Sequence, residues 1–182
     1  VQTGYLTIKK YNQDDGTFTL GYPNYEVRHS FLKALSDRYS QVGTGQSWAT
    51  VVRLEKSIRK NDIDGLMESL RSFFAGIEYD LHIKNEKYYQ TIFYLVFSLL
   101  GYRISTEVKT NKGRIDAVIT TNTHAYLFEF KLFDTAENAL KQINDKKYYE
   151  KFQSENKTIV CVGVSFSEDE RNLGEWKTEV VD

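Results

Sequence analysis

Several residue types that would point to a particular class of protein are scarce in these 182 residues. Cys161 is the only cysteine, which excludes an intramolecular disulfide, and its apolar neighbours favour a small core residue over a nucleophile. The three histidines, His29, His82 and His124, have no spacing typical of zinc ligands. Neither sign of charge dominates, so any binding of nucleic acid must come from a local patch.

Long apolar runs are also missing. The longest, near residues 92–100, is too short to cross a bilayer, and no signal peptide is visible. We therefore expect a cytoplasmic protein without membrane contact. The chain begins at Val1 and its only methionine is Met67, so we expect a fragment or a processed form of a longer protein.

The first part of the chain, residues 1–78, is expected to form a small, mostly helical segment with a β-hairpin. The Asp15-Gly16 pair favours a hairpin turn between two short strands. Helical spacing of apolar residues follows, and Asn61 or Asp62 is a fair N-cap. The predicted strands cover residues 4–11 and 17–22, and the predicted helices cover 25–39, 47–59 and a stretch that begins near 61–62.

The second part, residues 79–182, has a mixed pattern of helices and strands. Asn85 can cap a helix that runs to Leu100, with Gly101 as its stop. Three strands, a helix capped by Asp134 or Thr135 and a fully apolar strand then predict the order α-β-β-β-α-β with a mixed sheet. The predicted elements are strands 102–109, 115–120 and 125–131, a helix from 134–135 to about 152, and a strand over 158–166.

Two local details complete this prediction. In the first strand, strict alternation places Tyr102, Ile104, Thr106 and Val108 on one face of the sheet. At the end of the chain, Trp176 is expected to pack back on the domain, and residues 180–181 are expected to form an edge strand.

The chain is organised around the hairpin over residues 113–131. If the hairpin turns about Asn122-Thr123, Asp116 lies directly across from Glu129. Side chains alternate along a strand, so Glu129 and Lys131 share one face. Two carboxylates and one ammonium group therefore converge on an otherwise apolar sheet.

This convergence needs a physical reason, because like charges that face each other destabilise a strand pair. A hard cation such as Mg²⁺ would supply one, since it prefers carboxylate oxygens. The alternative is a solvated sheet edge at which Lys131 merely neutralises Glu129. Glu86 shares a helix stripe with Gln90, Phe93, Phe97 and Leu100, and the helix dipole alone would favour an acid there.

The element order, with Asp116 on the second strand and Glu129-x-Lys131 on the third, resembles the PD-(D/E)XK nuclease superfamily over about residues 79–176. Ile115 stands where the superfamily's name has Pro, a position that varies. The local amino-acid sequence is similar to that of a bacterial branch in which an ATPase-like module precedes the nuclease-like domain. The stretches that carry this likeness are 4–8, 20–24, 85–89, 113–116, 128–131, 139–143, 162–166 and 171–176.

The resemblance implies a restriction-endonuclease-like α/β (α+β) fold and hydrolysis of phosphodiester bonds in DNA. It implies that Asp116 and Glu129 bind Mg²⁺, for which Mn²⁺ can substitute, and that Lys131 orients the attacking water. Glu86 would complete the metal site through a water, and Gln142 would add a polar contact from the following helix. An ATPase-like region in the same native chain is a further implication.

Basic residues near this hairpin are candidates for contact with backbone phosphates. Lys109, Lys112 and Arg114 gather at the turn before the Asp116 strand, and Lys141 lies on the following helix. The alternative for most of them is a solvated surface. Two other functions also remain open: a non-catalytic module that binds nucleic acid or protein, and a metal-dependent hydrolase with another phosphate substrate.

Overall fold

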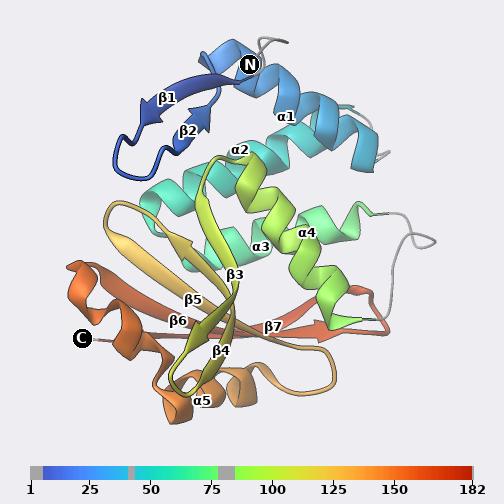
Figure 1. Cartoon of the computed structure of the whole chain (residues 1–182). Helices are drawn as coiled ribbons and strands as arrows, with labels where there is room; N and C mark the ends of the chain where they lie inside the picture. The colour runs from blue at the N-terminus through green and yellow to red at the C-terminus, as the bar shows by residue number, and fades with distance from the viewer. Residues whose placement is uncertain (1–5, 41–43, 78–84, 182) are drawn as a thin grey trace.

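The chain folds around a five-stranded mixed sheet (Figure 1). A computed structural model describes residues 6–40, 44–77 and 85–181. The sheet order is β3-β4-β5-β6-β7, in which β5 and β6 are parallel and the other neighbours are antiparallel. The elements are β1 (Thr7–Tyr11), β2 (Phe18–Gly21), α1 (Tyr25–Ser40), α2 (Thr44–Lys60), α3 (Ile63–Ala75), α4 (Glu86–Leu99), β3 (Arg103–Thr110), β4 (Gly113–Thr120), β5 (His124–Lys131), α5 (Ala136–Lys146), η2 (Tyr148–Glu155), β6 (Thr158–Ser167) and β7 (Asn172–Val181).

The predicted order α-β-β-β-α-β is confirmed, and the predicted edge strand is longer than expected. β7 begins at Asn172 and pairs with β6 along nearly its whole length. Only Leu173 of β7 is buried, because one face of this edge strand meets solvent. Because most of its residues are polar, a pattern of apolar residues does not predict the full length of this strand.

Helices cover both faces of the sheet, so the protein has two hydrophobic clusters. α2, α3 and α4 lie on one side of the sheet and α5 lies on the other (Figure 1). The larger cluster joins α2–α4 to the sheet through residues such as Leu70, Phe93 and Phe128. The smaller cluster joins α5 and η2 to the opposite face through residues such as Leu127 and Ile143. Within the described parts, no helix is long and apolar enough to cross a membrane.

The proposed boundary between residues 78 and 79 lies outside the described residues, and so does His82. The segment before it does not stand apart from the sheet. Leu54 of α2 and Met67 of α3 are fully buried in the same cluster as the sheet residues. The first 78 residues therefore supply part of the core that supports the sheet.

The helix predicted to run to about residue 152 is shorter than expected. α5 ends at Lys146, Lys147 adopts left-handed backbone angles, and the 3₁₀ helix η2 follows. This break turns Tyr148 and Phe152 into the smaller cluster, where both are buried. The Tyr148 hydroxyl lies so close to Gly113 that a Cβ there would approach it to 2.6 Å. Tertiary packing thus overrides the helical pattern.

The strict alternation predicted for β3 is wrong in its second half. Glu107 has a φ of 55°, an uncommon conformation for a residue other than glycine. Ile104 packs against the larger cluster, whereas Val108 packs against the smaller one on the opposite face. The twist at Glu107 therefore exchanges the two faces of β3 at the level of Asp116.

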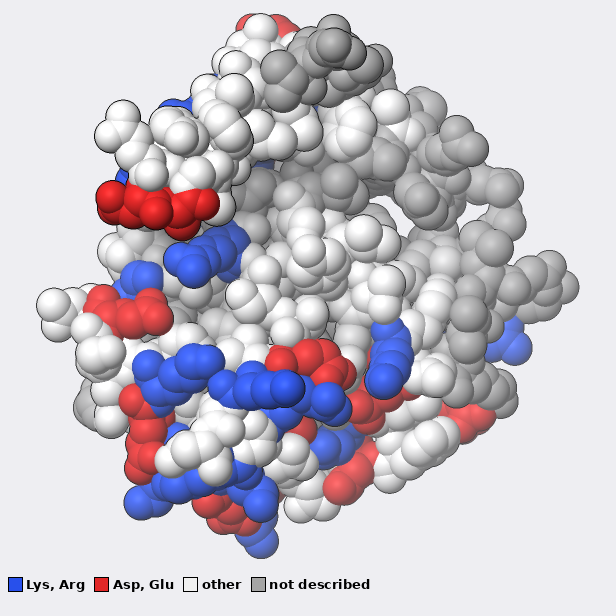
Figure 2. Space-filling view, in the orientation of Figure 1, with Lys and Arg blue, Asp and Glu red and all other residues white. Residues whose placement is uncertain are grey.

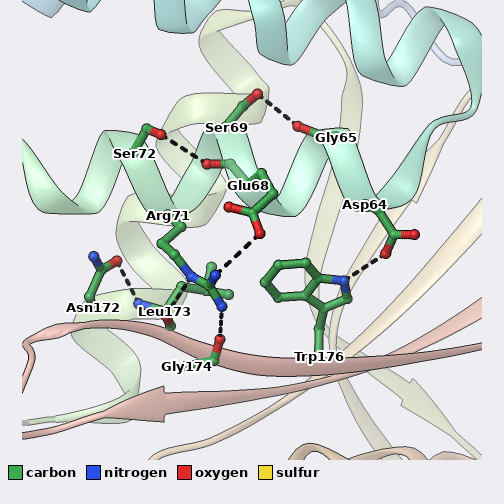
Figure 3. Close-up of polar contacts among 10 residues, drawn as sticks. All are labelled: Asp64, Gly65, Glu68, Ser69, Arg71, Ser72, Asn172, Leu173, Gly174 and Trp176. Carbon is green, nitrogen blue, oxygen red and sulfur yellow. Dashed lines mark hydrogen bonds and ion pairs between the residues drawn. The ribbon is translucent and has the colours of Figure 1, made fainter.

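A cluster of polar contacts fastens α3 to β7 (Figure 3). The Arg71 guanidinium donates to the carbonyl oxygens of Leu173 (3.2 Å from Nε) and Gly174, and lies 4.6 Å from the centroid of the Trp176 ring. The Trp176 indole N–H in turn donates to Asp64 Oδ1 over 2.8 Å. Trp176 thus packs back on the domain, as predicted.

We expect Arg71→Ala to lower the free energy of unfolding by about 1–3 kcal/mol, because two charge-assisted hydrogen bonds and a cation–π contact are lost. Urea unfolding followed by circular dichroism measures the change. Arg59→Ala is the control, since the Arg59 side chain is 72% exposed and its ion pair with Glu55 lies within one helix. Equal losses in the two variants would contradict a specific clasp between α3 and β7.

Candidate active site

The register of the central hairpin agrees with the prediction from sequence. β4 and β5 pair from Thr120↔Ala125 to Ala117↔Phe128, and the same register continued sets Asp116 opposite Glu129. The regular pairing stops at this point. Asp116 Oδ2 instead accepts a hydrogen bond of 2.8 Å from the backbone N–H of Phe130. The Asp116 side chain thus replaces part of the ladder and is held toward β5.

Glu129 is the most enclosed charged residue of the site, with 2% of its surface exposed. Its Oε1 accepts from Lys131 Nζ over 3.2 Å and from Gln142 Nε2 of α5. Its Oε2 is buried and has no hydrogen-bond partner in the described chain. An unpartnered buried carboxylate oxygen is costly, so this atom marks a position that favours a cation.

Burial and repulsion shift the pKa values of both carboxyl groups. Burial raises the pKa of Glu129 to about 7; the negative charge of Asp116 adds to this rise and Lys131 opposes it. Burial also raises the pKa of Asp116 to about 6, although the Phe130 N–H bond lowers it. Each carboxyl group is thus partly protonated near neutral pH unless positive charge is added.

Close contact between α5 and the sheet brings Gln142 to Glu129. β6 pairs Gly163 with Glu129, and a Cβ at position 163 would lie 2.2 Å from the Ala136 carbonyl oxygen. It would also lie 2.4 Å from the Leu140 backbone nitrogen. Only glycine permits this approach, which the sequence pattern alone does not reveal.

Glu86 lies within electrostatic range of Asp116 and Glu129. It does not form a metal-ligating group with them among the described residues. Its charge contributes to the raised pKa values of Asp116 and Glu129, after burial and nearer groups. Glu86 Oε1 accepts from Gln90 Nε2 over 3.3 Å, and the predicted stripe through Gln90, Phe93 and Phe97 is buried. The role of Glu86 as a metal ligand stays a prediction.

The described residues contain no group of three or more His, Cys, Asp or Glu side chains placed to hold a metal ion. Two carboxylates are still a suitable set for Mg²⁺, which often keeps several waters and binds one or two protein carboxylates together with substrate phosphate. The unpartnered Oε2 of Glu129 and the raised pKa values of both acids fit this demand. The residues present therefore fit a divalent cation.

The predicted phosphate contacts differ in their surroundings. Lys112 Nζ pairs with Glu150 over 3.0 Å, and Arg114 pairs with Glu107. Lys109 and Lys141 are exposed, and no ion pair joins either of them to the described acidic residues. Lys and Arg gather on the lower part of the molecule, over the β3–β4 hairpin and α5, with acidic residues among them (Figure 2).

One residue near the site escaped the sequence reasoning. Glu107 falls opposite Asp116 in the β3–β4 register, and its charge contributes to the raised pKa of Asp116. Pairing the two strands on paper would have found it, but its left-handed backbone has no sequence signal. Cys161 is fully buried and burial raises its pKa to about 12, so its assignment to the core is confirmed.

The pKa shifts predict how the free energy of unfolding of the metal-free protein depends on pH. Folding raises the pKa of Glu129 from 4.5 to about 7, so the folded state binds more protons and loses stability as pH rises through this window. Glu129→Gln removes this loss and should gain roughly 1–3 kcal/mol relative to wild type between pH 5 and pH 8. Urea unfolding in EDTA at both pH values measures it. Asp145→Asn, an exposed change on α5, should follow wild type; a parallel curve for Glu129→Gln would refute the shift.

A second prediction concerns the α5 contact. Gly163→Ala should force α5 away from β6, lower the free energy of unfolding by roughly 1–3 kcal/mol and move Gln142 from Glu129. Gly174→Ala is the matched control, because a Cβ there lies 3.1 Å or more from its neighbours. Thermal unfolding compares the two, and a smaller loss for Gly163→Ala than for Gly174→Ala would count against close packing.

Comparison with known proteins adds two findings. Residues 84–176 match the PD-(D/E)XK nuclease superfamily. The chain is also 37% identical over 185 residues to a protein of Azotobacter chroococcum mcd 1 described as "Uncharacterized protein in vnfD 5'region". That alignment covers 94% of this chain but 35% of the relative, so the chain spans about a third of that protein's length.

The superfamily match includes α4, β3–β5, α5, β6 and the part of β7 up to Trp176. It therefore includes the whole candidate site. It extends over just over half of the chain. Because the match covers more than half of the chain, the chain belongs to the PD-(D/E)XK nuclease superfamily.

Proposed function

We propose that the chain is a Mg²⁺-dependent nuclease domain that hydrolyses phosphodiester bonds in DNA, with Mn²⁺ able to substitute. The observation that carries this proposal is the unpartnered, buried Oε2 of Glu129, one strand away from a second buried acid, Asp116. A structural ion pair with Lys131 alone would not require that atom to be left without a partner. Membership of the superfamily supports the same reading.

Asp116 and Glu129 are the residues that would hold the cation. When bound, it would act as a Lewis acid for the phosphoryl oxygens and lower the pKa of a coordinated water. Gln142 and Lys131 both donate to Glu129 Oε1, which leaves Oε2 directed to ligand binding. Gln142 therefore serves as a positioning residue, since it fixes the orientation of the Glu129 carboxylate.

Lys131 has a second role beyond pairing with Glu129. Its side chain is 22% exposed, while that of Glu129 is 3% exposed, so the ammonium group lies between the buried acid and solvent. An approaching phosphate would meet this positive charge first. Lys131 can then hold the attacking water or stabilise negative charge that develops on the phosphate.

Four basic side chains near the site are the proposed contacts for DNA phosphates. Lys109 and Lys141 lack acidic partners among the described residues, and Lys112 and Arg114 could exchange Glu150 and Glu107 for phosphates. The number of such contacts is small, so binding should be modest and should weaken with salt. We also propose that residues 1–78 are the end of, or the linker from, an ATPase-like module of a longer native chain; the superfamily match concerns the nuclease-like part alone.

A second candidate function is a catalytically silent module of the same fold that binds nucleic acid or protein. One observation favours it: the described chain has no cluster of three potential metal-ligating side chains. Fold alone does not guarantee activity. Metal binding and cleavage must therefore be measured separately.

The test combines thermal unfolding in Mg²⁺ or Mn²⁺ with cleavage of linear, circular, branched and single-stranded DNA. Wild type should gain thermal stability with metal and cleave at least one substrate. Asp116→Asn should lose both properties, because one of two ligands becomes neutral. Lys131→Ala should retain the stabilisation by metal but lose cleavage by roughly 100-fold or more.

Asp145→Asn serves as the control, since it removes an exposed acid of α5 and should behave as wild type. Stabilisation by metal without cleavage of any DNA would favour the silent module. Wild-type protein that does not respond to metal at all would exclude the assigned site.

A further inference from the structure

The turn between β5 and α5 displays an aromatic side chain shortly after the last site residue of β5. Phe133 is 80% exposed, the largest value among the large hydrophobic side chains of the described residues. It follows Lys131 by two positions. Single exposed apolar residues are common on protein surfaces, so exposure alone does not indicate a function.

The structure on both sides of Phe133 distinguishes it from an ordinary exposed residue. Before it, Leu132 is 7% exposed and belongs to the larger hydrophobic cluster. After it, Asp134 Oδ1 accepts from the Thr135 N–H at 2.8 Å and from Asn138 Nδ2 at 2.6 Å. Thr135 Oγ1 then caps α5 by accepting from the Asn138 N–H at 3.1 Å. A turn that is anchored at both ends therefore holds the ring in solvent.

This turn is in electrostatic contact with the site. Hydrogen bonds from Asn138 and Thr135 lower the pKa of Asp134, and the charge of Lys131 lowers it further. Lys131 therefore pairs with Glu129 and also acts electrostatically on Asp134 of the turn. A phosphate at Lys131 would bring its own nucleotide within reach of the turn.

The charge of the turn selects which part of a nucleotide can occupy it. Asp134 directly follows Phe133, and Glu137 lies in the first turn of α5. Both are exposed acids, so they repel a phosphate backbone. An uncharged base does not meet this repulsion, and each base has a face that stacks on an aromatic ring. In the interior of a duplex, both faces of a base are covered by its neighbours. The ring can therefore serve only an unpaired or terminal base.

We infer that Phe133 is a stacking platform for an unpaired base next to the phosphate held at Lys131, so that the domain prefers DNA with single-stranded character. This inference rests on the proposed function and specifies its substrate class: single strands, flaps and frayed ends.

Binding of fluorescein-labelled oligonucleotides to the full chain, in an Asp116→Asn background that prevents cleavage, tests the inference. Phe133→Ala should weaken binding of single-stranded DNA by roughly 5- to 100-fold and leave binding of a closed hairpin duplex nearly unchanged. Phe133→Trp should retain binding, whereas Phe133→Leu should resemble Phe133→Ala. Tyr25→Ala is the control, because Tyr25 is 65% exposed and lies on the N-terminal helix α1.

Oligonucleotides with 2-aminopurine at successive positions provide a direct readout of stacking. At one position of the oligonucleotide, 2-aminopurine should lose fluorescence when it binds the protein with Phe133 or the Phe133→Trp variant. It should keep its fluorescence when it binds Phe133→Ala. Equal losses for single-stranded and duplex DNA, or full function with Leu, would overturn the stacking role. So would a concentration-dependent dimer that Phe133→Ala abolishes while the preference for single strands persists. These results are distinct from a failure of the proposed function. That function fails if the Asp116→Asn protein binds no DNA and the wild type cleaves none.

Discussion

The burial of two carboxyl groups in the middle of an otherwise apolar sheet is the constraint on which the site depends. Asp116 and Glu129 are 9% and 2% exposed, and desolvation is the largest cause of the raised pKa of each. A sheet with apolar residues at both positions would avoid this cost. The Phe130 N–H and the Lys131 ammonium group offset part of it. Glu129 Oε2 still has no hydrogen-bond partner among the described residues, and added positive charge there would offset the remaining cost.

The surrounding fold is arranged so that these acids keep their orientation. Gly163 lets the backbone of α5 approach β6, which carries Gln142 to Glu129. On the other side, the left-handed conformation of Glu107 interrupts β3 opposite Asp116. A regular ladder on both sides would leave the Asp116 carboxylate no backbone donor, because the Phe130 N–H would pair with a carbonyl oxygen. Irregular backbone on one side and close packing on the other thus serve the same two residues.

Local sequence signals predict the parts of this structure that local physics determines. The turn about Asn122-Thr123 fixes the register of β4 and β5, and Asn85, Asp62 and Thr135 each cap the expected helix. The twist at Glu107 and the left-handed Lys147 were not predictable in this way, because neither position carries glycine or asparagine. The residues that follow them, Val108 and Tyr148, pack in the smaller hydrophobic cluster, which joins elements far apart in the sequence. The closeness of Gln142 to Glu129 has the same origin, although the resemblance to the superfamily suggested the residue.

The near-neutral charge of the chain is compatible with a polyanionic substrate if recognition is not mainly electrostatic. Lys112 and Arg114 already pair with acids, so their net contribution to an encounter with phosphate is small. Carboxylates at the centre of the site repel phosphate until a cation balances them. Affinity must therefore come in part from contacts that do not depend on charge. The stacking platform proposed at Phe133, two residues after Lys131, would provide such a contact, because stacking of a base on an aromatic ring does not depend on charge.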